Sequence, residues 1–227
     1  MKKEELTEAL RQELLATQTM EEFEAKIGFS MDDFLLIKKG LSQRESQATA
    51  HVGSQAPLFS AIPISKDGSA GTKISLADFC NGQQPLALVF GSYTCPVFRK
   101  HNSAIQQVYR KYKDKAISFL HMYVYEMHPV DVWFIKDNLQ DQVVYDQPLT
   151  LLERAAVARD WIQKYQVDMP VALDDMDNSV DKLYAGSPER LYLVDSNGVI
   201  KFRSAEGPFA DREVEKWETA IEESINH

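Results

Sequence analysis

The side chain with the clearest chemical potential is that of Cys95, which stands between a short apolar run and a segment with helical spacing. Residues 86–90 read Leu-Ala-Leu-Val-Phe, which is typical of a buried strand. Pro96 suits the first position of a helix, because its missing N–H costs nothing there. The pattern therefore predicts a thiol at a helix N-terminus, where unpaired N–H groups and the helix dipole favour negative charge. We expect Cys95 to be a low-pKa, reactive thiol rather than an inert core residue.

The chain contains two cysteines, which is too few for a disulfide framework in 227 residues. Phe98 stands where a Cys-x-x-Cys motif carries its second cysteine. The sequence thus indicates neither a dithiol motif nor a tetrahedral zinc site, and we expect no bound metal or cofactor. Cys80 ends a short predicted helix and is interpreted as a buried structural thiol, with a resolving role toward Cys95 as the alternative.

Composition restricts the classes of partner. Apolar residues make up 44% of the chain and charged residues 26%, as in ordinary globular proteins. The net charge of −9 argues against a nucleic-acid binder. No stretch approaches the ~20 apolar residues of a membrane span, and the first residues lack the apolar core of a signal peptide. We therefore expect a cytoplasmic protein that binds neither membranes nor nucleic acids.

The elements around Cys95 are predicted to bring further polar side chains to it. Residues 116–125 form a second apolar run, which follows the helix that starts at Cys95. Such a strand–helix–strand unit makes the two strands parallel neighbours, so that their carboxyl ends meet at one edge of the sheet. Ligands of open α/β sheets bind at that edge. Glu126 and His128 directly follow the second strand and are expected beside Cys95.

The later part of the chain completes an α/β pattern. Thr150 and Glu153 form a capping box at the start of a helix, and Asn197-Gly198 is a hairpin signal. The predicted elements are a helix, a strand, two hairpin strands and a closing helix, over residues 149–165, 171–173, 190–195, 199–204 and 213–225. This order predicts a thioredoxin-like (peroxiredoxin-like) fold, with a central sheet, flanking helices and an N-terminal helical extension.

Two further features belong to this pattern. Pro188 stands where thioredoxin-like folds carry a cis-proline facing the thiol, so the Ser187–Pro188 bond is predicted to be cis. Residues 174–178 are acidic, but the spacing of a calcium loop is absent, and they are interpreted as a turn and a helix cap.

The N-terminal residues form a separate helical region. Leucines at four-residue spacing and two start signals, at Thr19 and Ser30, predict three amphipathic helices over residues 1–42, the third ending at Gly40. Residues 42–54 are polar and indicate a linker. We therefore divide the chain into an extension, 1–48, and a catalytic domain, 49–227. The apolar stripes must pack on the same chain or on a second subunit, so a homodimer is one expectation.

Several motifs resemble those of the iodothyronine deiodinase family. Residues 88–96, Leu-Val-Phe-Gly-Ser-Tyr-Thr-Cys-Pro, are similar to the family's active-site segment, which carries selenocysteine at the position of Cys95. Residues 125–133, Tyr-Glu-Met-His-Pro-Val-Asp-Val-Trp, resemble a second family motif. Shorter matches occur at 175–178, 188–192 and 207–208. The resemblance covers roughly residues 50 to 225 and is specific at the first two motifs.

The resemblance implies a reductive dehalogenase that removes iodide from iodinated phenols or iodothyronines. Cys95 would be the nucleophile that takes iodine from the ring, and an external thiol, small or thioredoxin-like, would then release iodide. The resemblance implies that His128 binds the phenol of the substrate and that Glu126 lies close to the nucleophile. The other residues that we expect to contribute to catalysis or to substrate binding are Ser92, Thr94, Tyr123, Pro188, Glu189 and Arg190.

Two other functions remain open from the sequence. A peroxiredoxin-type thiol peroxidase places Thr or Ser three residues before its cysteine, as Ser92 is here, and needs an arginine beside the thiolate, for which Arg190 is available. The other alternative is a non-catalytic thioredoxin-like module that recruits a partner through residues 1–42.

Overall fold

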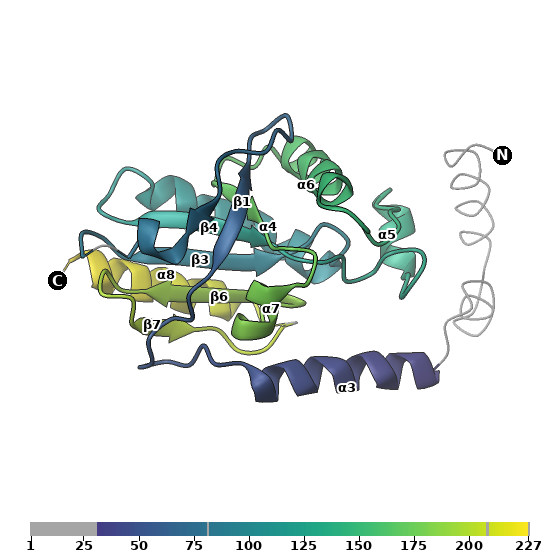
Figure 1. The fold of residues 1–227 in the computed structure, drawn as a ribbon, viewed down its shortest axis with the longest axis horizontal. Helices are drawn as coiled ribbons and strands as arrows, with labels where there is room; N and C mark the ends of the chain where they lie inside the picture. The colour runs from purple at the N-terminus through teal and green to yellow at the C-terminus, as the bar shows by residue number, and fades with distance from the viewer. Residues whose placement is uncertain (1–30, 81, 208, 227) are drawn as a thin grey trace.

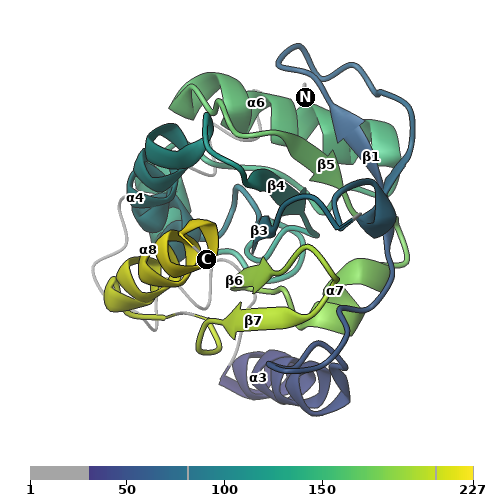
Figure 2. The same cartoon turned by 90° about the vertical axis from the view of Figure 1, so that its left-hand side faces the viewer.

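The computed structural model describes residues 31–80, 82–207 and 209–226, which form a mixed seven-stranded sheet with helices on both faces (Figures 1 and 2). The strand order is β2-β1-β5-β4-β3-β6-β7. The strands are β1 Ser60–Ile64, β2 Ile74–Ser75, β3 Leu86–Gly91, β4 Ser118–Tyr123, β5 Val171–Leu173, β6 Glu189–Val194 and β7 Ile200–Arg203. The helices are α3 Met31–Gln47, η1 Leu76–Asp78, α4 Pro96–Tyr112, α5 Lys136–Gln140, α6 Leu151–Tyr165, α7 Ser179–Tyr184 and α8 Arg212–Ile225.

The centre of the sheet is the predicted strand–helix–strand unit. Strand β3 is buried along its whole length and pairs in parallel with β4, with Leu86 opposite Ser118 and Gly91 opposite Tyr123. On its other side β3 pairs antiparallel with β6. The predicted parallel neighbours are confirmed, and the loops that follow β3 and β4 meet at one edge of the sheet.

Two hydrophobic cores hold the layers together. Helices α4, α6 and α8 cover one face, where Trp161 and Trp217 are fully buried. Helix α7 and the segment before β1 cover the other face, around Phe90 and Tyr184. Successive residues of a strand point to opposite faces, so each core is built from alternate positions of the same strands. Cys95 belongs to the core that α4, α6 and α8 cover.

Helix α3 differs from its prediction, because it continues through Gly40 to Gln47 into the expected linker. Tertiary contacts account for the extension: Glu45 pairs with Arg190 at 2.6 Å and with Arg203 at 2.7 Å. Figure 1 shows α3 lying along the underside of the sheet domain, beyond β7 and α7. The two helices predicted before it lie outside the described residues.

Several local predictions are confirmed. The Thr150–Glu153 capping box opens α6, and the Ser187–Pro188 bond is cis. The acidic cluster acts as a helix cap: the Asp174 carboxylate accepts hydrogen bonds from the backbone N–H groups at the start of α7. Within the described parts of the chain, no helix is long and apolar enough to cross a bilayer.

Candidate active site around Cys95

Cys95 is the N-cap residue of α4, as predicted, and directly follows the turn that leaves β3. Its backbone N–H donates to the Ser92 carbonyl at 3.2 Å, and its side chain makes no capping hydrogen bond to the first turn of the helix. The side chain is almost completely buried, with 2% exposure. The thiol therefore points into the protein, beneath the first turn of the helix.

The protonation state of Cys95 differs from the prediction. Burial, reinforced by the nearby Glu189 carboxylate, raises the pKa of the Cys95 thiol to about 12. The backbone N–H groups at the start of α4 lower the pKa, but they do not compensate for the hydration that a buried thiolate loses. The expected low pKa is wrong, and a proton must leave Sγ before the sulfur can act as a nucleophile.

Glu126 and Tyr123 hold the turn before Cys95. Oε2 of Glu126 accepts a hydrogen bond from the backbone N–H of Thr94 at 2.9 Å, and Oε1 accepts from the Tyr123 hydroxyl. The same hydroxyl accepts from the backbone N–H of Tyr93 at 3.0 Å. Burial raises the pKa values of both Glu126 and Tyr123. The side chains of this network are buried, and they fix the backbone of the turn rather than contacting Sγ.

His128 lies in the loop after β4, stacked edge-on against Trp133 with ring centroids 4.2 Å apart. Its Nδ1 lies 3.2 Å from the Trp133 carbonyl oxygen, so the neutral ring carries its proton on Nδ1 and leaves Nε2 as an acceptor. Burial lowers the pKa of His128 to about 4, and the ring is therefore neutral at pH 7. A neutral acceptor of this kind suits the hydroxyl group of a phenol.

Thr94 joins the Cys95 turn to the His128 loop. Its Oγ1 accepts a hydrogen bond from the backbone N–H of His128 at 3.0 Å. Asn138 completes the link by donating to the carbonyl oxygens of both Thr94 and His128. Thr94 is fully buried and engaged by protein groups, so the structure gives it a positioning role. Cys95, Glu126 and His128 are thereby brought to one edge of the sheet, as predicted.

Ser92 and Pro188 also lie at this edge. Ser92 Oγ is buried and has no hydrogen-bond partner among the described residues, so it is not joined to the Tyr123–Glu126 network. Pro188 is buried and immediately precedes β6, whose first residue, Glu189, lies opposite Gly91 at the end of β3.

Arg190 is not part of the site. It pairs with Phe90, whose side chain belongs to the core on the sheet face away from α4. Its guanidinium donates to the Ala185 and Ser204 carbonyl oxygens and to Glu45 of α3. The arginine that a peroxidase needs beside its thiolate is therefore not supplied by Arg190. The physical reason is strand alternation, which turns neighbouring residues of β6 to opposite faces.

Cys80 is also remote from Cys95. It packs against the core on the face away from α4, and Asp195, beyond the far end of β6, acts on its thiol. Burial raises the pKa of Cys80 to about 11. Both cysteines are free thiols.

Charged residues of α4 form a second part of the site that the sequence did not reveal. Arg99 is buried and donates to the Tyr93 carbonyl and to Asp141. His101 lies between Glu189, at 3.1 Å, and Asp211, at 3.0 Å. In the sequence, His101 stands four residues before Ile105, a spacing that favours the buried face of a helix, but nothing in the sequence indicated its two acidic partners.

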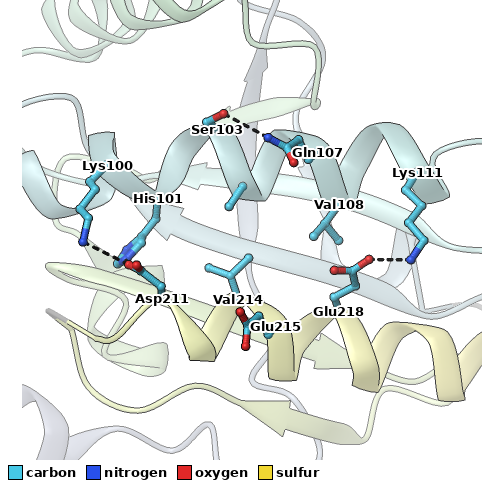
Figure 3. Close-up of a pocket in the computed structure, with 11 residues that line it drawn as sticks. Lys100, His101, Ser103, Gln107, Val108, Lys111, Asp211, Val214, Glu215 and Glu218 are labelled. Carbon is cyan, nitrogen blue, oxygen red and sulfur yellow. Dashed lines mark hydrogen bonds and ion pairs between the residues drawn. The ribbon is translucent and has the colours of Figure 1, made fainter.

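Two cavities adjoin these groups without exposing the thiol. A groove of about 610 Å³ runs between α4 and α8, and His101 and Asp211 lie at one end of it (Figure 3). A smaller cavity of about 210 Å³ lies between α3 and the loop after β4, with Leu41, Glu126 and Met127 in its lining. Cys95 lines neither of these two cavities, and only 2% of the residue is exposed.

The chain is similar to known proteins over most of its length. A family model described as iodothyronine deiodinase matches residues 9–223. Thyroxine 5-deiodinases of Rattus norvegicus and Homo sapiens are each 32% identical over 179 residues, covering 78% of this chain and 56% of theirs. A type II iodothyronine deiodinase of Gallus gallus is 31% identical over 172 residues, which covers 70% of this chain and 61% of that protein. The chain thus spans little more than half the length of these relatives.

Solved structures support the fold. The thioredoxin domain of a thiol-disulfide oxidoreductase from Bacteroides vulgatus is similar with a TM-score of 0.52 and 18% identity, over 78% of this chain and 99% of that one. Thioredoxin peroxidase I of Plasmodium yoelii is similar with a TM-score of 0.52 and 16% identity, over 78% of this chain and 92% of that one. At these identities the likeness concerns the fold alone, which is thioredoxin-like.

Proposed function

Because this chain belongs to the iodothyronine deiodinase family, we propose that it removes iodide from iodinated phenols by thiol-dependent reduction, with Cys95 as the nucleophile. In the first step the Cys95 sulfur takes iodine from the ring: the C–I bond breaks, an S–I bond forms, and the ring carbon takes up a proton. An external thiol then attacks the sulfenyl iodide, which releases iodide and leaves a mixed disulfide. A second external thiol reduces that disulfide and restores Cys95.

The other residues of the site have distinct roles in this proposal. His128 Nε2 accepts a hydrogen bond from the phenol hydroxyl and orients the ring, which the neutral tautomer allows. Glu126 and Tyr123 keep the turn before Cys95 in place through backbone N–H groups. Thr94 fixes the distance between the thiol and His128. The single observation that carries the proposal is this joining of Cys95 and His128 through Thr94 at one edge of the sheet.

The substrate class rests on the relatives and on the charge near the site. The mammalian relatives are named for action on thyroxine, which is an iodinated phenol with an amino-acid end. Glu206 precedes Gly207, and a Cβ at Gly207 would lie 2.8 Å from Glu189 Cγ, so a negatively charged residue stands next to the backbone that covers Glu189. Because that charge repels a carboxylate, we propose iodinated phenols that lack one as preferred substrates.

The test is iodide release from a set of iodinated phenols, iodotyrosines and iodothyronines with excess dithiol. The native chain is expected to release iodide, and Cys95→Ser is expected to release none while keeping its fold. Cys80→Ser is the matched control, because it removes the other thiol far from the site. Turnover by Cys95→Ser would overturn the proposal. Absence of iodide with rapid oxidation of Cys95 by peroxide would favour a peroxidase, and absence of both reactions would favour a non-catalytic module.

A further inference from the structure

His101, Glu189 and Asp211 form a continuous set of charged groups between the interior and the surface. Both Glu189 carboxylate oxygens lie within 3.2 Å of His101 Nδ1, and Asp211 Oδ1 lies 3.0 Å from His101 Nε2. With an acidic partner on each ring nitrogen, the imidazole can donate in both directions. Figure 3 shows His101 reaching from α4 toward Asp211 at the start of α8.

The three groups differ sharply in their access to water. The side chains of Glu189 and His101 are 1% and 4% exposed, whereas that of Asp211 is 70% exposed. The His101 ring is stacked on Phe209, with centroids 4.9 Å apart. Gly207 closes over Glu189, since a Cβ there would lie 2.8 Å from Glu189 Cγ. The cluster therefore runs from a dry carboxylate, through one imidazole, to a carboxylate in water.

The dry end of the cluster lies beside Cys95. Glu189 is opposite Gly91 in the sheet, and Gly91 is packed so closely under α4 that a Cβ there would lie 2.5 Å from the Phe98 ring. Residues directly opposite one another project to the same face, so Glu189 projects toward the first turns of α4. After burial, the Glu189 charge has the largest effect on the Cys95 thiol. Glu189 is thus the carboxylate on this face of the sheet whose charge acts most strongly on Cys95.

We propose that Glu189 is the base that accepts the Cys95 thiol proton, and that His101, held by Asp211, is a positioning residue that keeps Glu189 ionised. This inference rests on the proposed role of Cys95 as a nucleophile. In the step, the S–H bond breaks and an O–H bond forms on Glu189. The net charge of the cluster does not change, because the negative charge moves from oxygen to sulfur. No other reactant is required.

The electrostatics of the surrounding groups agree with this role. The hydrogen bond to Glu189 raises the pKa of His101, so the ring tends to carry the positive charge that a buried carboxylate needs. Burial raises the pKa of Glu189 and makes it a stronger base. The other charged groups that face the cluster are Lys100, paired with Asp211, and Arg99, which acts on Cys95.

The proposed role and a purely electrostatic role of Glu189 predict opposite effects of Glu189→Gln on the reactivity of the Cys95 thiol. If the carboxylate only repels the thiolate, Glu189→Gln lowers the pKa of Cys95 and makes the thiol more reactive at neutral pH. If Glu189 is the base, the same substitution makes the thiol less reactive, because the proton must then be lost directly to water. The sign of the change separates the two roles.

The experiment measures the rate at which iodoacetamide alkylates Cys95 from pH 6 to pH 9, in the full chain. Peptide mass spectrometry separates modification of Cys95 from that of Cys80. The native rate is expected to be nearly constant above the pH at which Glu189 ionises. Glu189→Gln is expected to be slower by roughly tenfold or more at pH 7 and to gain about tenfold per pH unit. His101→Gln is expected to raise the pH at which the alkylation rate becomes constant, because Glu189 then ionises only at higher pH.

Glu218→Gln is the matched control, because it makes the same substitution in the same groove, where Glu218 pairs with Lys111 and not with His101. Its profile is expected to follow the native one. Faster alkylation of Glu189→Gln at pH 7 would overturn the proposal, and so would an unchanged profile of His101→Gln or no native alkylation across the range. Far-ultraviolet circular dichroism identifies a variant that fails to fold. Iodide release by the native chain tests the proposed function separately.

Discussion

Replacing His128 by asparagine is expected to change the pH dependence of stability in a direction that follows from burial. The Asn side chain can still donate to the Trp133 carbonyl, but it does not titrate. Burial lowers the pKa of His128 from 6.5 to about 4 in the folded chain. Between these values the unfolded chain holds a proton that the folded chain lacks. The contribution of His128 to the free energy of unfolding is therefore fully present above pH 6.5 and is lost as the pH falls toward 4.

The size of the effect follows from the two pKa values. One pKa unit corresponds to about 1.36 kcal/mol, so the contribution falls by about 2 kcal/mol between pH 6.5 and pH 5. By pH 4 the loss reaches about 3 kcal/mol. The side chain is 8% exposed, so solvent screening reduces this figure little. Relative to the variant, the native protein should therefore lose about 2 kcal/mol on going from pH 8 to pH 5.

The assay is urea unfolding of both proteins at pH 8, 6 and 5, followed by tryptophan fluorescence. Taking the difference between native protein and variant cancels the titrations of other groups, including His121 and Glu126, that shift with pH in both. An NMR titration of the His128 ring gives the folded-state pKa independently. A stability difference that stays constant within about 0.5 kcal/mol across this range would refute the reasoning, because it would mean that His128 titrates alike in the folded and unfolded chains.

Two further predictions concern α3. Gly40→Ala should raise the free energy of unfolding by about 1 kcal/mol, because Gly40 is inside the helix and an added Cβ meets nothing within 4 Å. Urea unfolding at pH 8 measures this change, and a loss of stability would contradict the prediction. Glu45→Gln should lower that free energy by about 2 kcal/mol, because it leaves the buried Arg190 without its carboxylate partner. Faster proteolysis within α3 is expected with it, and unchanged unfolding and proteolysis would show that other contacts hold the helix.

The parts of the fold that local patterns control could be predicted from the sequence. The apolar run of β3, the helix start at Pro96 and the second run of β4 specify a parallel pair with a shared carboxyl edge. Convergence of Cys95, Glu126 and His128 follows from that pairing alone. The capping box of α6 depends on residues within one turn, which is why it was recognisable as well.

The sequence-based predictions that were wrong concern properties that depend on residues far apart in the chain. Strand β6 begins at Glu189, so alternation turns Glu189 toward α4 and Arg190 away from it. The sequence does not specify which of these two neighbours faces α4. The pKa of Cys95 depends on burial by the whole core, whereas the helix terminus is a local feature. Helix α3 passes Gly40 because Glu45 binds two arginines that lie far along the chain.

The position of Cys80 argues against it as a reducing thiol for Cys95. Strand β3 separates the two cysteines and has six residues, so its ends lie about 17 Å apart at ~3.3 Å per residue. A disulfide requires Cα atoms within about 7 Å, and Cys80 also lies on the opposite face of the sheet. Resolution by Cys80 would therefore require one of the two cysteines to move across the sheet. The proposed reaction accordingly takes both reducing thiols from another molecule, which makes Cys80→Ser a sound control for Cys95→Ser.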